Sequence, residues 1–385
     1  MPGHGDSLAR DFHASADGAL VALRLDRHHG GNVDACARRA GVKADEILDF
    51  SASINPLGPP ASAREAFVRS YDEVSRYPDP YGEELKRTLA KRHGMSPAEV
   101  LLGNGSTQLI YLICVALRPR TALVVDPAFS EYANALTLAD ASVNRLLPVD
   151  DASHFSLSRF MAVWDQKYDI AFLAAPNSVT GQLIARTDLE KIAKSAFIRK
   201  SFVVIDEAFI DFAEEKSVKS MVRQNPYVIV LRSLTKYYAL PGLRLGYLLG
   251  ESRRVAQLAA YQEPWCVNAP ALKVALACLN DAQFIARTTR WLAKERKFLF
   301  EQLAALDGFH PIPSQANFLL VKIEHKSAEA LQLRSFLLNQ KKILIRACDS
   351  FAGLGPGYFR VAVKRRKDNL RLLAALLEWA TLSNG

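Results

Sequence analysis

Short apolar runs alternate with segments of helical periodicity from about residue 83 to residue 250. Helical patterns cover 83–93, 106–117, 131–138 and 187–197. Apolar runs of strand length bounded by turn residues are typical of buried strands, and here they occupy 100–102, 121–125, 170–174, 202–205, 227–231 and 243–249. This alternation predicts an α/β fold whose mostly parallel sheet is covered by helices on both faces.

The pattern changes after about residue 270. A long helical stretch runs over 271–306, and short strand patterns follow at 318–323, 342–345 and 358–363 before a last apolar helix. This order indicates a second, smaller α+β domain. We therefore expect three parts: an N-terminal arm and loop (1–50), a large domain (51–270) and a small C-terminal domain (271–385).

Composition narrows the possible classes of protein. The 385 residues are 49% hydrophobic and 23% charged, which is ordinary for a globular chain. The net charge of +9 is spread along the chain, and its densest run, 364–367, is interpreted as the solvated face of a helix. We therefore expect a small anionic ligand and not nucleic acid.

The sequence also argues against a membrane protein and against a metal or disulfide framework. No apolar run approaches ~18 residues, so neither a membrane span nor a targeting segment is expected. The five cysteines are odd in number and none forms a CxxC pair. His28 and His29 have no carboxylate or cysteine at ligand spacing. We expect a cytoplasmic protein without a bound metal.

Ligands of open parallel sheets bind beyond the carboxyl ends of the strands, so the residues that follow each strand carry the argument. Gly105, Ser106 and Thr107 follow the first strand and open a helix, which suits a phosphate cup. An ordinary glycine turn with Ser106 as N-cap is the alternative. Phe129 follows the next strand, where it could stack on a flat ring or simply belong to the core.

The later strands end in polar groups. Asn177 follows one strand and could bond a ring oxygen or merely form a turn. Asp206 ends an apolar strand, where burying a carboxylate costs free energy unless a partner such as a cationic ring nitrogen is present. Alternatively, Asp206 caps a helix or forms a local ion pair. Ser233 and Lys236 follow a further strand, and Arg244 stands before the last one. Taken alone, Lys236 could be a surface lysine.

Together these groups match the needs of pyridoxal 5′-phosphate. The glycine turn, Ser233 and Arg244 would hold its phosphate, Asp206 would keep its ring nitrogen protonated, and Lys236 would bind its aldehyde. Asn177 precedes Asp206 by 29 positions and Asp206 precedes Lys236 by 30, each about one βαβ unit.

Longer strings strengthen this interpretation. The chain resembles the fold-type I pyridoxal phosphate enzymes over about 28–380, specifically the histidinol-phosphate aminotransferase-like branch. Several strings look like the threonine-phosphate decarboxylases of that branch, notably 29–32, 48–58, 205–212 and 353–363. Phe209 stands where aminotransferases of the branch usually carry tyrosine, which favours the decarboxylase group.

The resemblance implies a role for each candidate residue. Lys236 and Asp206 are the implied catalytic residues, and Tyr77 would reach the active site of a partner subunit in a homodimer. The other implied cofactor contacts are Gly105, Ser106, Thr107, Phe129, Asn177, Ser233 and Arg244. The substrate would meet Asn32, Asn55, Arg346 and Arg360, with the carboxylate and phosphate not yet assigned to particular arginines.

The expected reaction is decarboxylation of L-threonine O-3-phosphate to (R)-1-aminopropan-2-ol O-2-phosphate for cobalamin biosynthesis. A histidinol-phosphate-type aminotransferase and a phosphoserine decarboxylase stay open as alternatives. A DNA-binding regulator of this fold would need a further domain before residue 29. A dinucleotide oxidoreductase is disfavoured because the glycines of 353–357 lack the G-x-G-x-x-G spacing.

Overall fold

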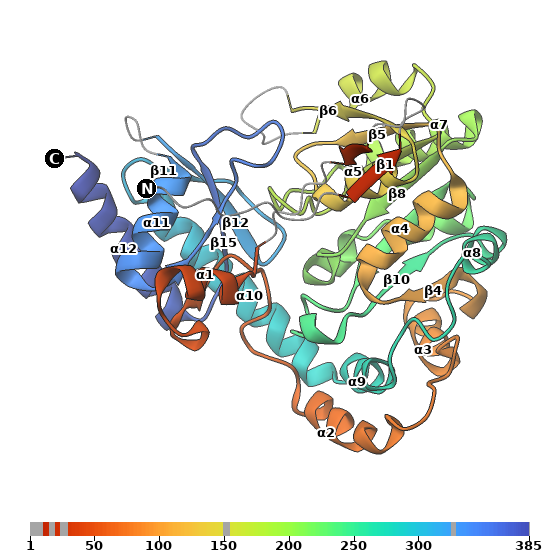
Figure 1. Ribbon diagram of the computed structural model, residues 1–385, viewed down its shortest axis with the longest axis horizontal. Coiled ribbons are helices and arrows are strands. Elements are labelled where there is room, and N and C mark those ends of the chain that lie inside the picture. Colours follow the sequence, from red (N-terminus) through yellow and green to blue (C-terminus); the bar gives the residue numbers. More distant parts are fainter. Residues whose placement is uncertain (1–10, 15–19, 24–29, 149–154, 325–328, 385) are drawn as a thin grey trace.

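The computed structural model describes residues 11–14, 20–23, 30–148, 155–324 and 329–384. Within them the chain forms two lobes (Figure 1). Most of the first 29 residues of the arm and loop expected over 1–50, with His28 and His29, lie outside the described residues. Their described part is an antiparallel pair of strands, β1 (Asp11–Ala14) and β2 (Leu20–Leu23).

The larger lobe is built on a seven-stranded sheet. Neighbouring strands β5, β6, β7, β8 and β9 run parallel, whereas β10 is antiparallel to both strands beside it. This confirms the α/β fold with a mostly parallel sheet. The strand order is β4 (Val100–Gly103), β10 (Gly246–Leu249), β9 (Val228–Ser233), β8 (Phe202–Asp206), β7 (Ile170–Ala174), β5 (Thr121–Val125) and β6 (Ser142–Leu146).

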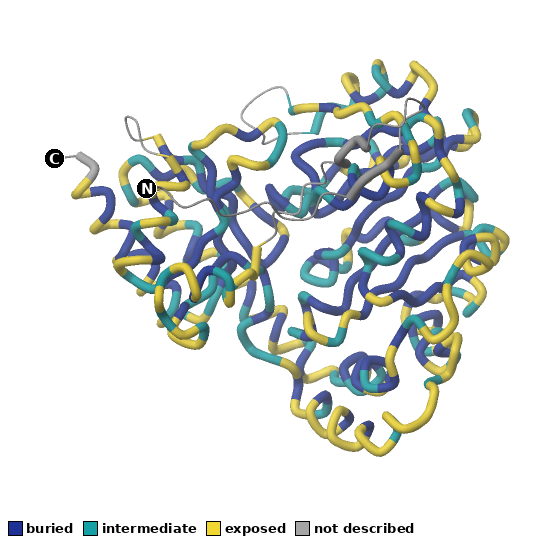
Figure 2. Tube along the Cα trace, in the orientation of Figure 1, coloured by how far each residue is buried: buried dark blue, intermediate teal, exposed yellow. Residues whose placement is uncertain are grey.

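Both faces of this sheet are covered, as the continuous apolar strands predicted. In β8, Val203 and Ile205 belong to one apolar core and Val204 to the other. The strands lie as buried segments between the helices in Figure 2. The first core includes residues of α3 (Glu83–His93), α6 (Leu157–Trp164), α7 (Arg186–Arg199) and α9 (Ala269–Leu279), and the second those of α4 (Gly105–Leu117), α5 (Ser130–Leu138) and α8 (Ser252–Ala259).

The smaller lobe has its own core around an antiparallel sheet. Its strand order is β11 (Phe309–Pro311), β12 (Phe318–Ile323), β15 (Tyr358–Ala362) and β14 (Arg346–Ala347), and it packs with α10 (Ala282–Ala304), α11 (Ala330–Lys341) and α12 (Arg366–Asn384).

An N-terminal segment also packs with this lobe. Helix α1 (Val33–Ala40) contacts Leu338 and Leu344, and β3 (Leu48–Asp49) pairs in parallel with β13 (Ile343–Leu344).

Several elements differ from the sequence prediction, three of them for a clear physical reason. The helical stretch expected over 271–306 is two helices, because Asp281 caps the start of α10 by accepting a hydrogen bond from Phe284 N at 2.8 Å. The strand expected over 243–249 begins only at Gly246, since Arg244 adopts a left-handed φ of 55°. The edge strand β6 was missed because most of its side chains are not buried, so it lacks an apolar run.

In the described part of the chain, no helix is long and apolar enough to cross a membrane. The five cysteines are all free of disulfide bonds. The cytoplasmic location and the domain limits at residues 50 and 270 stay predictions.

Candidate active site

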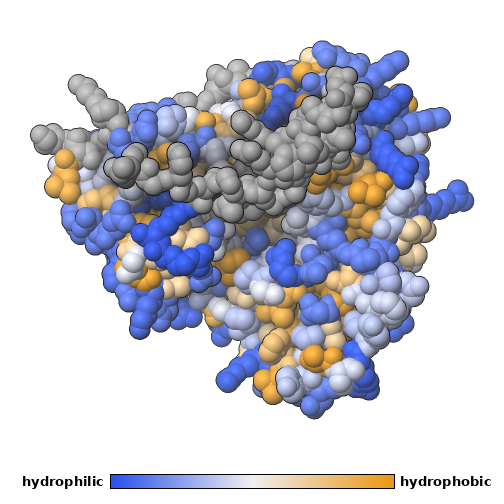
Figure 3. Space-filling view, viewed as in Figure 1, coloured by the Kyte–Doolittle hydropathy of each residue, from blue (hydrophilic) through white to orange (hydrophobic). Residues whose placement is uncertain are grey.

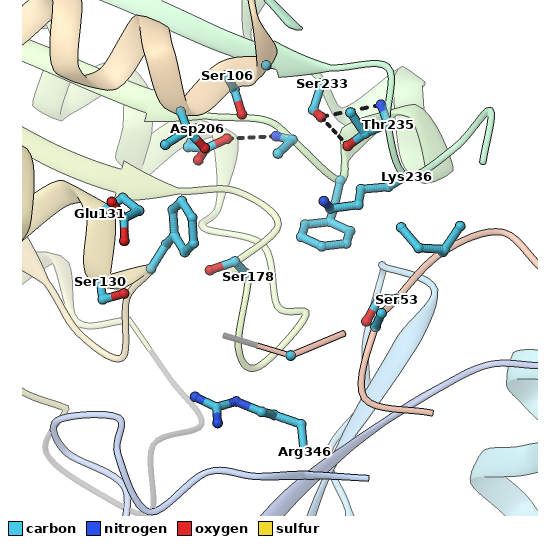
Figure 4. Close-up of a pocket in the computed structure, with 18 of the residues that line it drawn as sticks. Ser53, Ser106, Ser130, Glu131, Ser178, Asp206, Ser233, Thr235, Lys236 and Arg346 are labelled. Carbon is cyan, nitrogen blue, oxygen red and sulfur yellow. Dashed lines mark hydrogen bonds between the residues drawn. The ribbon is translucent and has the colours of Figure 1, made fainter. Parts of the chain in front are cut away.

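A cavity of about 700 Å³ is lined by residues from both lobes and from the segment that precedes them. Figure 4 shows side chains of both lobes pointing into it. The strand ends of the large sheet form one wall, and β14 and β15 of the smaller lobe form the other. Ten predicted site residues line the cavity: Gly105, Ser106, Thr107, Phe129, Asp206, Ser233, Lys236, Arg244, Arg346 and Arg360.

Asp206 is a buried carboxylate at the end of β8, with only 5% of its surface exposed. Its Oδ2 accepts a hydrogen bond from Tyr132 OH at 2.5 Å, and its Oδ1 accepts one from Ala208 N at 2.8 Å. Burial raises the pKa of Asp206, while those hydrogen bonds and the nearby Lys236 charge oppose the rise. Neither hydrogen-bond donor is a cation, so a protonated ring nitrogen would complete the charge balance.

Lys236 follows β9 and points into the same cavity (Figure 4). Burial lowers the pKa of its amine to about 8, and the positive charges of Arg244 and Arg360 act in the same direction. Asp206 opposes the shift. An amine with this pKa is partly neutral near pH 7 to 8, which is the form that attacks an aldehyde.

The start of α4 forms an anion cup. The Asn104 side chain does not cap this helix, so the first backbone N–H groups stay available to a ligand. Gly105 has a left-handed φ of 77°, which favours glycine, and a Cβ there would lie 2.6 Å from Arg244 Nη2 and displace the guanidinium. The Ser233 and Thr235 hydroxyls are 2.8 Å apart beside the cup. This set suits a phosphate.

Arg346 and Arg360 come from neighbouring strands of the smaller lobe and lie directly opposite each other in the β14–β15 register. Arg360 donates from Nη1 to Ser178 O and from Nη2 to Ser51 O, the latter at 3.4 Å. Burial lowers the pKa of Arg360 to about 10, and the charge of Arg346 adds to the shift. These two cations together provide a wall suited to an anionic substrate.

Two predicted residues have their polar atoms turned to protein instead of the cavity. Asn177 Nδ2 donates to Pro127 O at 2.8 Å, and its Oδ1 accepts from Val179 N and Thr180 N, so the side chain closes a turn. Asn55 Nδ2 donates to Tyr237 O at 2.8 Å and to a threonine hydroxyl. Neither side chain lines the cavity.

The last two predicted residues are on the surface. Asn32 is exposed before α1, while Gly30, two positions earlier, lines the cavity. Tyr77 is 80% exposed, with its ring centroid 4.7 Å from that of Trp265, and it does not line the cavity of its own chain.

Sequence reasoning missed several residues that the structure brings to the site. Tyr132 holds Asp206, and it lies in the first turn of α5, three positions after Phe129, which precedes the helix in an extended conformation. Ser178 lines the cavity beside the turn made by its neighbour Asn177, and Thr235 contacts Ser233. The pattern of polar residues in this turn does not indicate whether Asn177 or Ser178 lines the cavity.

Comparison with known proteins identifies the family. The profile described as "Aminotransferase class I and II" matches residues 45–376, well over half of the chain. The chain belongs to this family. Threonine-phosphate decarboxylase of Salmonella typhimurium is 38% identical over 351 residues, which are 90% of this chain and 95% of that protein.

Two further proteins are similar to this chain. A bifunctional adenosylcobalamin biosynthesis protein of Leptospira interrogans is 30% identical over 352 residues, 90% of this chain and 40% of that protein. The solved histidinol-phosphate aminotransferase of Clostridium acetobutylicum superposes with a TM-score of 0.82 at 28% identity, covering 87% of this chain and 100% of that one.

The chain is a pyridoxal 5′-phosphate-dependent enzyme of this family. The residues in the cavity fit the cofactor: among the described residues no cation bonds Asp206, Lys236 has a lowered pKa, and the start of α4 offers free N–H groups. Which side chain contacts which cofactor atom stays a prediction.

The first prediction concerns the pH dependence of cofactor attachment. Because only the neutral Lys236 amine attacks the aldehyde, the rate at which the apo-protein binds pyridoxal phosphate covalently should rise about tenfold per pH unit below pH 8 and level off above it. Stopped-flow absorbance measures this rate. Arg360→Met removes a positive neighbour and should move the plateau to higher pH. A wild-type rate still rising at pH 10 would contradict the assignment.

Proposed function

We propose that the enzyme decarboxylates L-threonine O-3-phosphate to (R)-1-aminopropan-2-ol O-2-phosphate, for use in cobalamin biosynthesis. The observation that carries the proposal is the pair Arg346 and Arg360, which line the wall of the cavity that also holds Lys236. Like charges directly opposite on antiparallel strands are destabilising. A substrate with two anionic groups, a carboxylate and a phosphate, would place one anion beside each arginine.

The surroundings of the two arginines suggest which anion each one binds. Arg360 lies close enough to Lys236 to lower the pKa of its amine, and backbone carbonyls hold its guanidinium in place. We assign the substrate carboxylate to Arg360, because that group is attached to the reacting carbon. Arg346 bonds Ser350 Oγ at 3.0 Å and lies over the Phe351 ring, so we assign the phosphate to it.

Bound pyridoxal phosphate supplies a protonated ring that accepts the electron pair left when a bond to the substrate α-carbon breaks. Asp206 keeps the ring nitrogen protonated, because a buried carboxylate without another cation in contact favours a cation there. The grip of Arg360 on the carboxylate would set which bond of the α-carbon breaks. The Lys236 amine then returns a proton to the α-carbon after carbon dioxide has left.

An aminotransferase acting on a phosphorylated amine is the second candidate function, since a solved histidinol-phosphate aminotransferase covers the same fold at 28% identity. Phe209 argues against it. The Phe209 ring packs edge-on against Phe318 with centroids 5.1 Å apart, and it has no hydroxyl to bond a ring oxygen. Phosphoserine differs from phosphothreonine by one methyl group, worth only about 1 kcal/mol in a pocket.

The second prediction tests the reaction itself. Protein loaded with pyridoxal phosphate and given L-threonine O-3-phosphate, without a keto acid, should release carbon dioxide over many turnovers. Trapping the released gas as carbonate measures it. Lys236→Ala should abolish the release, because it removes the group that holds the aldehyde and returns the proton.

Two other results would contradict this reaction or this substrate. Absence of carbon dioxide, together with conversion of the cofactor to pyridoxamine phosphate by histidinol phosphate, would replace the decarboxylase with an aminotransferase. A higher kcat/KM for L-serine O-phosphate than for the threonine ester would move the substrate to phosphoserine.

The third prediction separates the two arginines. Arg346→Gln should lower kcat/KM for L-threonine O-3-phosphate by roughly 10- to 100-fold, because a charge-assisted bond to phosphate is lost, and leave kcat/KM for unphosphorylated L-threonine nearly unchanged. Arg360→Gln should lower kcat/KM for both substrates by a similar factor. Steady-state kinetics with the two substrates measures the ratio. The reverse pattern would exchange the assignments.

We also propose a homodimer whose partner supplies Tyr77 to the cofactor phosphate. The segment from Phe67 to Tyr81 exposes several large apolar side chains, among them Tyr71, Val74 and Tyr77, which are 77%, 62% and 80% exposed. Figure 3 shows apolar side chains at the surface over this part of the larger lobe. Clustered exposure of this kind marks a contact surface more often than a solvated one.

The fourth prediction tests this assembly. Sedimentation equilibrium should give twice the mass of one chain, and the double variant Tyr71→Lys with Val74→Lys should sediment as a monomer because it places charges in the interface. The monomer should also bind pyridoxal phosphate more weakly, since it lacks Tyr77 of the partner subunit. A wild-type protein that is monomeric while it turns over substrate would contradict the proposal.

A further inference from the structure

Ser178 lines the cavity and carries a buried hydroxyl that has no hydrogen-bond partner among the described residues. The residue lines the cavity on the loop after β7, and its Oγ is shielded from solvent. No described residue bonds this atom. Figure 4 shows Ser178 on the side of the cavity between Asp206 and Arg346. A buried hydroxyl left unpaired is destabilising, so a ligand atom that accepts its proton is expected here.

The neighbouring residue cannot take this role. The Asn177 amide nitrogen donates to Pro127 O at 2.8 Å, and its oxygen accepts two backbone N–H groups of the turn. Rotating the amide toward the cavity would break all three bonds. Phe209, which also lines the cavity, has no polar atom to offer.

The strand register indicates which cofactor atom Ser178 faces. Strands β7 and β8 are neighbours, with Ala174 opposite Asp206, so the loop that carries Ser178 lies beside the carboxylate assigned to the ring nitrogen. In pyridoxal phosphate the ring hydroxyl lies next to the aldehyde carbon, which Lys236 binds. With the ring nitrogen at Asp206 and the aldehyde at Lys236, the ring oxygen of the cofactor would lie on the side of the loop that carries Ser178.

We propose that Ser178 Oγ donates a hydrogen bond to the ring hydroxyl oxygen of bound pyridoxal phosphate, in the role that the sequence suggested for Asn177. This inference rests on the cofactor arrangement of the proposed function. Ser178 also contacts the substrate side of the cavity, because its backbone oxygen accepts a bond from Arg360 Nη1. One residue thereby connects the cofactor ring with the arginine assigned to the carboxylate.

The fifth prediction uses Ser178→Ala, which removes the hydroxyl and keeps the backbone bond to Arg360. The dissociation constant of pyridoxal phosphate should rise roughly tenfold, as expected for loss of one hydrogen bond to a charged oxygen. The apo-protein should unfold at the same or higher urea concentration, because the alanine removes an unpaired buried group. If Ser178 had only a structural role, its replacement would not weaken cofactor binding while leaving the stability of the apo-protein unchanged or higher.

The absorbance of the bound cofactor gives a second readout. The ring oxygen shares a proton with the nitrogen that links the cofactor to Lys236. Without a donor that oxygen keeps more negative charge and holds the proton more tightly, so the pH midpoint of the absorbance change should rise in Ser178→Ala. Ser178→Thr, which retains a hydroxyl, should restore the midpoint.

Ser53→Ala is the matched control. Ser53 also lines the cavity with a buried, unpaired Oγ, but it comes from the segment before β4 and not from the loop beside Asp206. The cofactor affinity and the absorbance midpoint of the Ser53→Ala variant should equal those of the wild type. An equal loss in Ser53→Ala would overturn the inference.

The remaining outcomes separate this inference from the proposed function. A wild-type protein that binds no pyridoxal phosphate at Lys236 would overturn the proposed function. A wild type that binds it, with Ser178→Ala unchanged in affinity and midpoint, would overturn the role of Ser178 alone. If Ser178→Ala binds the cofactor as the wild type does but has a raised KM, the inference is wrong and Ser178 contacts the substrate instead of the cofactor.

Discussion

The register of the central strands is the constraint on which the site depends. Ala174 of β7, Asp206 of β8 and Leu231 of β9 are paired across the sheet, so three loops begin at one edge. That edge holds Asp206, and Lys236 follows a few residues after β9. A slip of one residue would turn the carboxylate toward the opposite face, because side chains alternate along a strand.

A buried ion network lies directly behind this edge. Arg232, which is fully buried, bonds Glu207 Oε2 at 3.1 Å and Asp211 Oδ1 at 2.7 Å. Arg232 and Glu207 are the residues next to Ser233 and Asp206. Removing one partner of such a pair leaves an uncompensated buried charge, which costs about 3–5 kcal/mol. The network therefore holds the ends of β8 and β9 where the cavity needs them.

The fold brings several charged side chains of the two lobes together at the cavity. Arg346 and Arg360 repel one another across two strands, and Arg360 also lowers the pKa of Lys236. In the proposed function, an anionic substrate would offset this repulsion. Lys236 and Asp206 would serve decarboxylation and transamination alike, so the choice of reaction would depend on how the two arginines hold the substrate.

The sequence by itself determined the α/β fold, the cofactor class and the residues at strand ends, because strand ends are marked by an abrupt change from apolar to polar positions. Asp206, Lys236 and the glycine turn of α4 could be predicted for that reason. Only the tertiary structure shows that the Asn177 side chain bonds its own turn whereas Ser178 lines the cavity, because backbone hydrogen bonds within one turn separate the two neighbours. Tyr132 and Asn55 depend on packing between segments distant in sequence, and the opposition of Arg346 to Arg360 depends on strand register, which local pattern does not encode.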